Sequence, residues 1–311
     1  MDQSPELVPR PEQAPPASTF PLYDVFFNDI ELRAGWRFFM FYITLKVARL
    51  GAAFLVRYAQ RAPSANQHVG AFGPGPFIIS DGVSFMVLLG VSALMARFEN
   101  RKLGQYGLPF RLAFRGDFWL GGLWGFGAVS VLLLTLRADH NFSYGAPELS
   151  GWSIVRFASL WAVAFLAVGL YEEFYLRGYA QFTLTTGISF WPAAFLLSFF
   201  FAALHLGNPG ETKFGLFQIV LIGLFFCFTL WRTGTLWFAV GFHAAWDWAQ
   251  SFFYGTPDSG IVAQGHLLHS SFAGPDWLTG GTVGPEGSVL VAPLLVLLCV
   301  LFYFAFPNRA P

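Results

Sequence analysis

The sequence contains eight long runs of apolar residues, which are separated by polar stretches. A bilayer has a hydrocarbon core about 30 Å thick, and a helix needs about 20 apolar residues to cross it. The pattern therefore predicts an all-α, polytopic membrane protein with about eight transmembrane helices. The runs lie near residues 36–56, 77–95, 118–136, 155–180, 189–206, 214–231, 235–253 and 288–306.

The first run is the least regular, because Lys46 and Arg49 interrupt it. Long basic side chains can extend their charged ends to the membrane surface, and both residues can also pair with Asp81 in the second run. A helix that lies in the membrane interface is an alternative for this segment.

Composition supports a membrane protein. Of the 311 residues, 55% are hydrophobic and only 12% are charged, a balance unlike that of a soluble domain. The formal net charge is zero, so no basic surface argues for a nucleic-acid partner. Cys227 and Cys299 lie inside apolar runs and are expected to be packing residues, because they have no neighbouring ligand cluster.

The two ends of the chain and its loops predict the organisation and the orientation. Residues 1–22 are rich in proline and are expected to form a disordered tail without a cleavable signal peptide, and 23–311 a single transmembrane domain. Basic residues concentrate in loops such as 99–117, on the side of both termini, whereas the loop 254–287 has no Lys or Arg. The positive-inside bias therefore predicts cytoplasmic termini.

Charged and titratable side chains also lie inside the apolar runs. A charge at the centre of a membrane helix costs about 2.5–3.5 kcal/mol, so such groups usually face protein or a wet cavity and are candidates for function. Three clusters stand out, and they are Glu172, Glu173 and Arg177 in the fourth run, His205 at the end of the fifth, and His243 with Asp247 in the seventh.

Helical geometry separates the roles within the first cluster. Glu173 and Arg177 are four residues apart and share a helix face, which favours an ion pair. Glu172 points about 100° away from Glu173 and is left free of that pair. We expect Glu173 and Arg177 to support the local structure, and Glu172 to act as a general base.

His243 and Asp247 are likewise four residues apart, so both can face one cavity. Together with Glu172 and His205 they can activate water in two ways. Glu172 can deprotonate the water directly while the histidines stabilise developing charge. Alternatively His205, His243 and Glu172 can hold a zinc ion whose bound water is acidified. The residue types alone do not choose between these mechanisms.

Other interpretations compete with catalysis. A single membrane histidine is often a packing residue, and a Glu–Arg pair is often a structural brace. A proton-coupled transporter also uses such groups, although the chain lacks paired broken helices in corresponding halves. No function is predicted for the four loop histidines, His68, His140, His266 and His269.

Three short motifs resemble those of the CAAX protease and bacteriocin-processing family of intramembrane endopeptidases. EEFYLR at 172–177 is similar to E-E-x-x-x-R, FAALH at 201–205 to F-x-x-x-H, and HAAWD at 243–247 to H-x-x-x-(N or D). Their order and their positions in the runs agree, and the resemblance covers a protease core at about 152–253.

The resemblance implies an eight-helix intramembrane protease in which Glu172 activates water beside His205. It also implies that His243 and Asp247 complete the site, either as metal ligands or as donors to the oxyanion. Many members have asparagine where this chain has Asp247. An ionised carboxylate accepts hydrogen bonds and binds metals but cannot donate to an oxyanion.

The simplest helix boundaries conflict with this site. A fourth helix from Trp152 would place Glu172 roughly 30 Å along its axis, whereas His205 would lie about 24 Å along the returning fifth helix. The two groups would then be far apart. We therefore expect the fourth span to be shifted to about 160–182, with Arg156 at the interface, and the fifth to be tilted or broken near Pro192.

These inferences combine into one expected function. The chain is predicted to be an endopeptidase of a bacterial cell membrane that cleaves a membrane-associated peptide or protein. Zinc is the one candidate cofactor. Its partners are then the lipid bilayer and the polypeptide substrate. The alternative is a non-catalytic membrane module that binds or scaffolds a partner.

Overall fold

The helices of the computed structural model follow the apolar runs closely. The structure describes residues 23–28, 31–60 and 71–307. The expected tail 1–22 and the loop residue His68 lie outside the described residues. The α-helices are α1 (Tyr23–Phe26), α2 (Ala34–Gln60), α3 (Pro74–Phe98), α4 (Gly116–Ala138), α5 (Trp152–Arg177), α6 (Tyr179–Ile188), α7 (Phe190–Leu204), α8 (Lys213–Thr233), α9 (Trp237–Asp247), α10 (Asp276–Thr279) and α11 (Val291–Ala305).

Short elements connect these helices. Three two-stranded pairs join β1 (Phe27–Asn28) to β2 (Glu31–Leu32), β3 (Ala71–Phe72) to β5 (Val262–Ala263), and β4 (Phe142–Ser143) to β6 (Ser271–Phe272). Three short 3₁₀ helices are η1 (Leu103–Tyr106), η2 (Phe110–Leu112) and η4 (Pro285–Gly287). The π-helix η3 (Trp248–Phe253) continues α9.

Five stretches of the described residues are long and apolar enough to cross a membrane. They are Ala34–Val56, Pro74–Phe98, Gly116–Ala138, Trp152–Ile188 and Lys213–Thr233. The helices α7 and α11 are apolar but have only 15 residues each. The all-α, polytopic architecture is therefore found, whereas the expected count of about eight spans stays a prediction.

The outer surface of the bundle is apolar. Large hydrophobic side chains on several helices are more than half exposed, for example Phe54 on α2, Met86 on α3, Phe199 on α7 and Phe304 on α11. A soluble protein rarely exposes so much contiguous apolar surface, whereas lipid chains cover it at little cost. The exposed belt thus supports an integral membrane protein.

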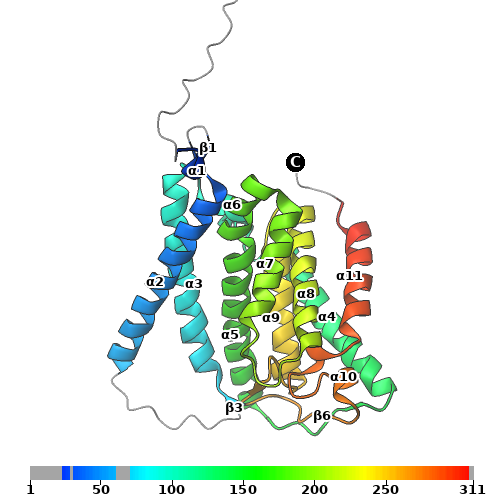
Figure 1. Ribbon diagram of the computed structural model, residues 1–311. Helices are drawn as coiled ribbons and strands as arrows, with labels where there is room; N and C mark the ends of the chain where they lie inside the picture. The colour runs from blue at the N-terminus through cyan, green and yellow to red at the C-terminus, as the bar shows by residue number, and fades with distance from the viewer. Residues whose placement is uncertain (1–22, 29–30, 61–70, 308–311) are drawn as a thin grey trace, which may run out of the picture.

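The ends of the bundle differ (Figure 1). The short helix α1 and the C-terminal end of α11 lie at one end, whereas β3, β6 and α10 lie at the other. Both described ends of the chain are therefore on the same side of the bundle, as expected for termini that share a compartment.

The shift of the fourth span to about 160–182 stays a prediction, since the helical stretch Trp152–Ile188 includes those residues and extends beyond them at both ends. The break expected as one alternative near Pro192 is not found, because Pro192 lies in the first turn of α7, where a missing N–H breaks no helical bond. The chain breaks instead at Gly178, where a Cβ atom would lie 2.3 Å from the carbonyl oxygen of Phe174.

The helical chain continues past Gly178, and this continuation removes the predicted separation between Glu172 and His205. The helix α6 carries the chain beyond the end of α5 before α7 turns back at Ser189 (Figure 1). Glu172 and His205 are almost equally far along the chain from that turn. Both side chains therefore reach the same depth and line the same cavity.

Glycines bring α4 and α9 into direct backbone contact. A Cβ atom at Gly121 would lie 2.1 Å from the carbonyl oxygen of Phe238, and one at Gly125 would lie 2.1 Å from that of Phe242. Small residues allow such close packing of membrane helices. Because His243 follows Phe242, this contact fixes the position of a candidate site residue.

Replacing Gly125 by alanine is expected to destabilise the protein by about 1–3 kcal/mol, because the added methyl group must separate the two backbones. Thermal unfolding in detergent measures the effect. Gly127→Ala is the matched control, since nothing lies within 4 Å of a Cβ atom there and alanine has the higher helix propensity. Equal stability of the two variants would contradict the proposed contact.

Candidate active site

A cavity of about 430 Å³ opens inside the bundle, and polar side chains cluster on its wall. Helices α5, α7 and α9 contribute to this wall, together with α2, α3, α8 and the loop that follows η3. The predicted site residues that line it are Glu172, His205, His243 and Asp247. Residues far apart in the sequence thus meet around one polar space in an apolar bundle.

The predicted ion pair between Glu173 and Arg177 is confirmed. Arg177 Nη1 lies 3.4 Å from Glu173 Oε1, and neither side chain is exposed. The guanidinium also lies 4.7 Å from the ring centre of Phe201, so that aromatic packing accompanies the ion pair. Both charges are buried where the dielectric constant is low, so removing either one would leave the other without a compensating charge.

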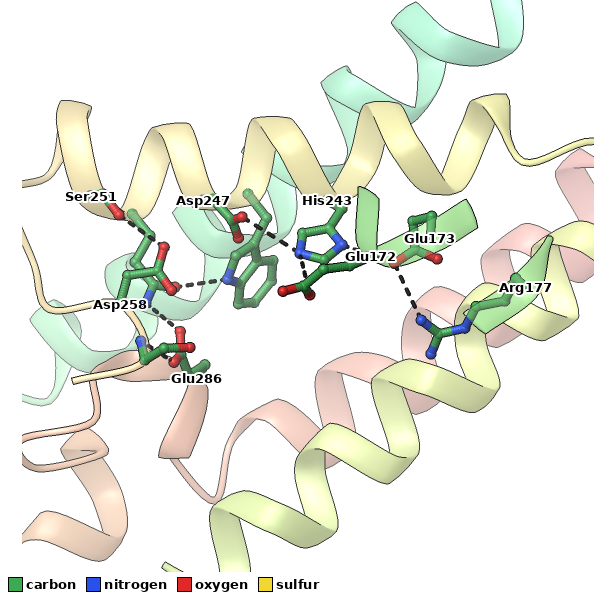
Figure 2. Close-up of polar contacts among 11 residues, drawn as sticks. Glu172, Glu173, Arg177, His243, Asp247, Ser251, Asp258 and Glu286 are labelled. Carbon is green, nitrogen blue, oxygen red and sulfur yellow. Dashed lines mark hydrogen bonds and ion pairs between the residues drawn. The ribbon is translucent and has the colours of Figure 1, made fainter. Parts of the chain in front are cut away.

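His243 is the centre of the polar cluster, as Figure 2 shows. Its Nδ1 lies 2.8 Å from Glu173 Oε1, which can only accept, so Nδ1 carries a proton. The other nitrogen, Nε2, lies 3.7 Å from Glu172 Oε2 and 3.5 Å from Asp247 Oδ2. Glu173 therefore orients the ring, and Nε2 faces the two remaining carboxylates.

The two adjacent glutamates do have different surroundings. Glu173 is fully buried between Arg177 and His243, whereas 27% of the Glu172 side chain is exposed towards the cavity. Helix periodicity predicted this division. It did not predict that Glu173 also holds His243, since that contact depends on how α5 packs against α9.

His205 shares the cavity but stands apart from the other three residues. It caps the C-terminus of α7, where Nδ1 donates to the carbonyl oxygen of Phe201 at 2.8 Å and the ring packs edge-on against the Phe201 ring. Of its two nitrogens, only Nε2 is left for water or a substrate. Its role in the chemistry stays a prediction.

Two acidic residues of the loop that follows η3 also lie on the cavity wall, and the sequence pattern did not indicate them. Asp258 Oδ2 accepts a hydrogen bond of 2.8 Å from the hydroxyl of Ser251, and Glu286 Oε1 accepts one of 2.6 Å from the backbone N–H of Ser259. The side-chain amide of Gln250 also donates to Glu286 (Figure 2). Both carboxylates come from a glycine-rich loop, where no periodicity indicates which side chains turn inward.

Burial raises the pKa of both of these carboxyl groups, and the negative charge of Asp258 raises that of Glu286 further. Their ordinary values are 3.8 and 4.5. Between those values and the raised ones, the folded protein binds more protons than the unfolded chain. The contribution of these two groups to the free energy of unfolding is therefore fully present below their ordinary values and is expected to be lost as the pH rises through the raised values.

This loss of stability is measured by thermal unfolding across a pH series. Asp258→Asn removes one titrating group and is expected to flatten the profile, each pKa unit corresponding to about 1.4 kcal/mol. The control is Asp139→Asn, which alters an exposed carboxylate. If the unfolding temperature of Asp258→Asn changes with pH as steeply as that of the wild type, this assignment is refuted.

Basic residues from α2 line the opposite part of the cavity. Arg49 donates a hydrogen bond to the hydroxyl of Tyr171, and Lys46 lies 5.1 Å from the ring centre of Tyr42. Pairing with Asp81, one of the two alternatives for these residues, is not seen as a direct ion pair in the described residues, although Asp81 lines the same cavity.

The predicted zinc ligands are not gathered for metal binding. Among the residues that the structure describes, one group of three has all its ligand atoms within 4.8 Å of one another, and it consists of Glu148, His266 and His269. The set of His205, His243 and Glu172 does not meet that distance. Zinc at the cavity stays a prediction.

Comparison with known proteins agrees with the three motifs. Residues 154–249, just under a third of the chain, match the family model described as type II CAAX prenyl endopeptidase Rce1-like. No curated protein matches the chain. The resemblance to the CAAX protease family is thereby confirmed for a segment that runs from α5 to η3 and contains every predicted site residue.

Proposed function

We propose that this chain, which carries an Rce1-like CAAX protease segment, is an intramembrane endopeptidase that cleaves a membrane-associated peptide or protein. The observation that carries the proposal is the pairing of Glu172 with His243 across 3.7 Å in an internal cavity. A carboxylate and an oriented imidazole are the groups that peptide hydrolysis by activated water requires.

Glu172 is the general base in this mechanism. It takes a proton from a water molecule, and the resulting hydroxide attacks the carbonyl carbon of the scissile bond. The protonated Glu172 then gives its proton to the leaving nitrogen as the C–N bond breaks. The products are a carboxylic acid and an amine, so all atoms of the water are accounted for.

His243 stabilises the transition state. With both nitrogens protonated, it donates Nδ1–H to Glu173 and directs Nε2–H into the cavity, towards the oxygen on which negative charge develops. Asp247, 3.5 Å from Nε2, stabilises the positive ring. His205 is proposed to bind water or the substrate carbonyl through Nε2.

The proposal is tested by cleavage in proteoliposomes that contain the purified chain and H₂¹⁸O. One peptide ends in a prenylated CAAX sequence, because the matching family consists of CAAX prenyl endopeptidases, and a second peptide lacks the lipid. Mass spectrometry should detect a product carboxylate with one ¹⁸O atom. No labelled product from either these peptides or a broad peptide library would favour the alternative, a non-catalytic binding module.

The orientation in the membrane is proposed separately. Basic residues concentrate on the side of both termini, so that side is expected to be cytoplasmic and the loop 254–287 to lie outside. Reporter fusions at the C-terminus test this orientation. A reporter that is active only outside the cytoplasm should stay inactive, and activity would reverse the assignment.

A further inference from the structure

A second titratable cluster lies outside the cavity, where the segment that precedes α5 meets the loop that follows η3. Glu148 Oε1 lies 2.6 Å from His269 Nδ1, and Glu148 Oε2 lies 3.0 Å from His266 Nε2. We propose that Glu148, His266 and His269 form a zinc site that joins these two segments. This proposal is independent of the catalytic one.

Backbone pairing holds two of the three side chains in place. The strands β4 and β6 pair antiparallel, and the pairing continues beyond them through Pro147 and Leu268. The N–H of Glu148 donates to the carbonyl oxygen of Leu267 at 2.9 Å, and that of His269 donates to Ala146 at 3.1 Å. Ligands on such a ladder are positioned before any metal arrives, which lowers the entropy cost of binding.

The ring of His266 is fixed in the orientation that a metal ligand needs. Its Nδ1 lies 2.7 Å from the carbonyl oxygen of Ala263, so Nδ1 carries the proton and Nε2 presents a lone pair. Metal-binding histidines are commonly held in this way. The buried Nε2 has no hydrogen-bond partner, although Glu148 Oε2 lies 3.0 Å away, because neither atom carries a proton in this tautomer.

The backbone packs closely around the cluster at two positions where only glycine fits, one between the two segments and one within the loop after η3. A Cβ atom at Gly145 would lie 1.7 Å from the carbonyl oxygen of His269, and one at Gly255 would lie 1.8 Å from that of Leu268 and 2.6 Å from the His266 ring. Gly255 also has a φ of 64°, which favours glycine. Glycine at these two positions thus allows the backbone to pack closely around the cluster.

The donor set and its spacing suit zinc. Two imidazoles and one carboxylate are a common three-ligand set for this ion, with a fourth position left for water. Zinc bonds of about 2.0–2.1 Å place tetrahedral ligands about 3.3 Å apart, so the observed separations of 2.6 and 3.0 Å need to widen by about 0.7 and 0.3 Å. The His269 side chain is 72% exposed, which leaves the fourth position open to solvent.

A metal at this place would strengthen the cavity wall. The carbonyl that orients His266 belongs to Ala263, and Ala263, Asp258 and Ile261 all line the cavity. Glu148 lies just before α5, which carries Glu172. Zinc would therefore tie the loop that closes the cavity to the segment that leads into the catalytic helix.

The test uses the full chain with the cavity histidines removed, because these are themselves predicted zinc ligands. The double variant His205→Ala, His243→Ala is loaded with zinc, dialysed and analysed for metal. We expect one zinc per chain, with binding at least about 100-fold weaker after Glu148→Gln or His266→Ala. The control His140→Asn, which removes an exposed imidazole from the same loop region, should retain the metal.

Cobalt and thermal unfolding supply two further readouts. Co²⁺ in the double variant should give the visible absorption of a four-coordinate site, and added zinc should raise the unfolding temperature, since it binds only the folded state. Glu148→Gln, which keeps the shape of the side chain, should abolish both effects. Absence of bound zinc in a folded double variant, or zinc that survives both Glu148→Gln and His266→Ala, would overturn the proposal.

Discussion

Replacing Glu172 by glutamine is expected to abolish peptide cleavage, with a loss of about 10²- to 10⁴-fold in kcat/KM. Glutamine keeps the size of the side chain but cannot accept the proton of the attacking water. Because 27% of the Glu172 side chain is exposed and His243 keeps Glu173 and Asp247 as partners, the variant should fold normally. Rates of cleavage in proteoliposomes, together with unfolding temperatures, measure both effects.

The matched control is Glu211→Gln. Glu211 also lines the cavity, but its carboxylate accepts a hydrogen bond from the backbone N–H of Thr212 instead of facing His243. It should retain most of the activity. Turnover at the wild-type rate in Glu172→Gln would remove Glu172 as the base, whatever the product analysis of the wild type had found.

Replacing Glu173 by glutamine is expected to cause the largest loss of stability, about 3–5 kcal/mol, because it leaves the buried guanidinium of Arg177 without a counter-charge. Cleavage should fall as well, since a neutral amide orients the His243 ring less firmly than the carboxylate that now lies 2.8 Å from Nδ1. Chemical unfolding in detergent gives the stability, and steady-state kinetics give kcat.

A second substitution separates these two effects. In the double variant Glu173→Gln, Arg177→Met no unpaired charge is buried, so much of the stability should return. The kcat should stay low, because His243 still lacks its carboxylate partner. Full recovery of kcat in the double variant would mean that Glu173 contributes only to folding.

Helix periodicity allowed the sequence to predict contacts within one helix. The pair of Glu173 with Arg177 and the shared face of His243 and Asp247 both follow from a spacing of four residues, and both are found. The approximate extents of the helices were also predictable, because the hydrophobic runs are long. These features depend on local geometry alone.

Contacts between elements were not predictable in the same way. The bond from His243 to Glu173 requires the packing of α5 against α9, and Asp258 reaches the cavity from an irregular loop. His266 and His269 were assigned no function because the sequence does not indicate that their loop pairs with Glu148. The break at Gly178 was missed since the apolar run continues through it.

The glycine contacts between α4 and α9 also determine where a substrate can approach. Two helices whose backbones already touch cannot part without losing that packing, so the wall that carries His243 is rigid. We therefore expect any lateral gate to lie near α2 and α3, whose residues Arg49 and Asp81 line the cavity. A lipid-anchored chain could slide through such a gate directly from the bilayer, without leaving the membrane to reach Glu172.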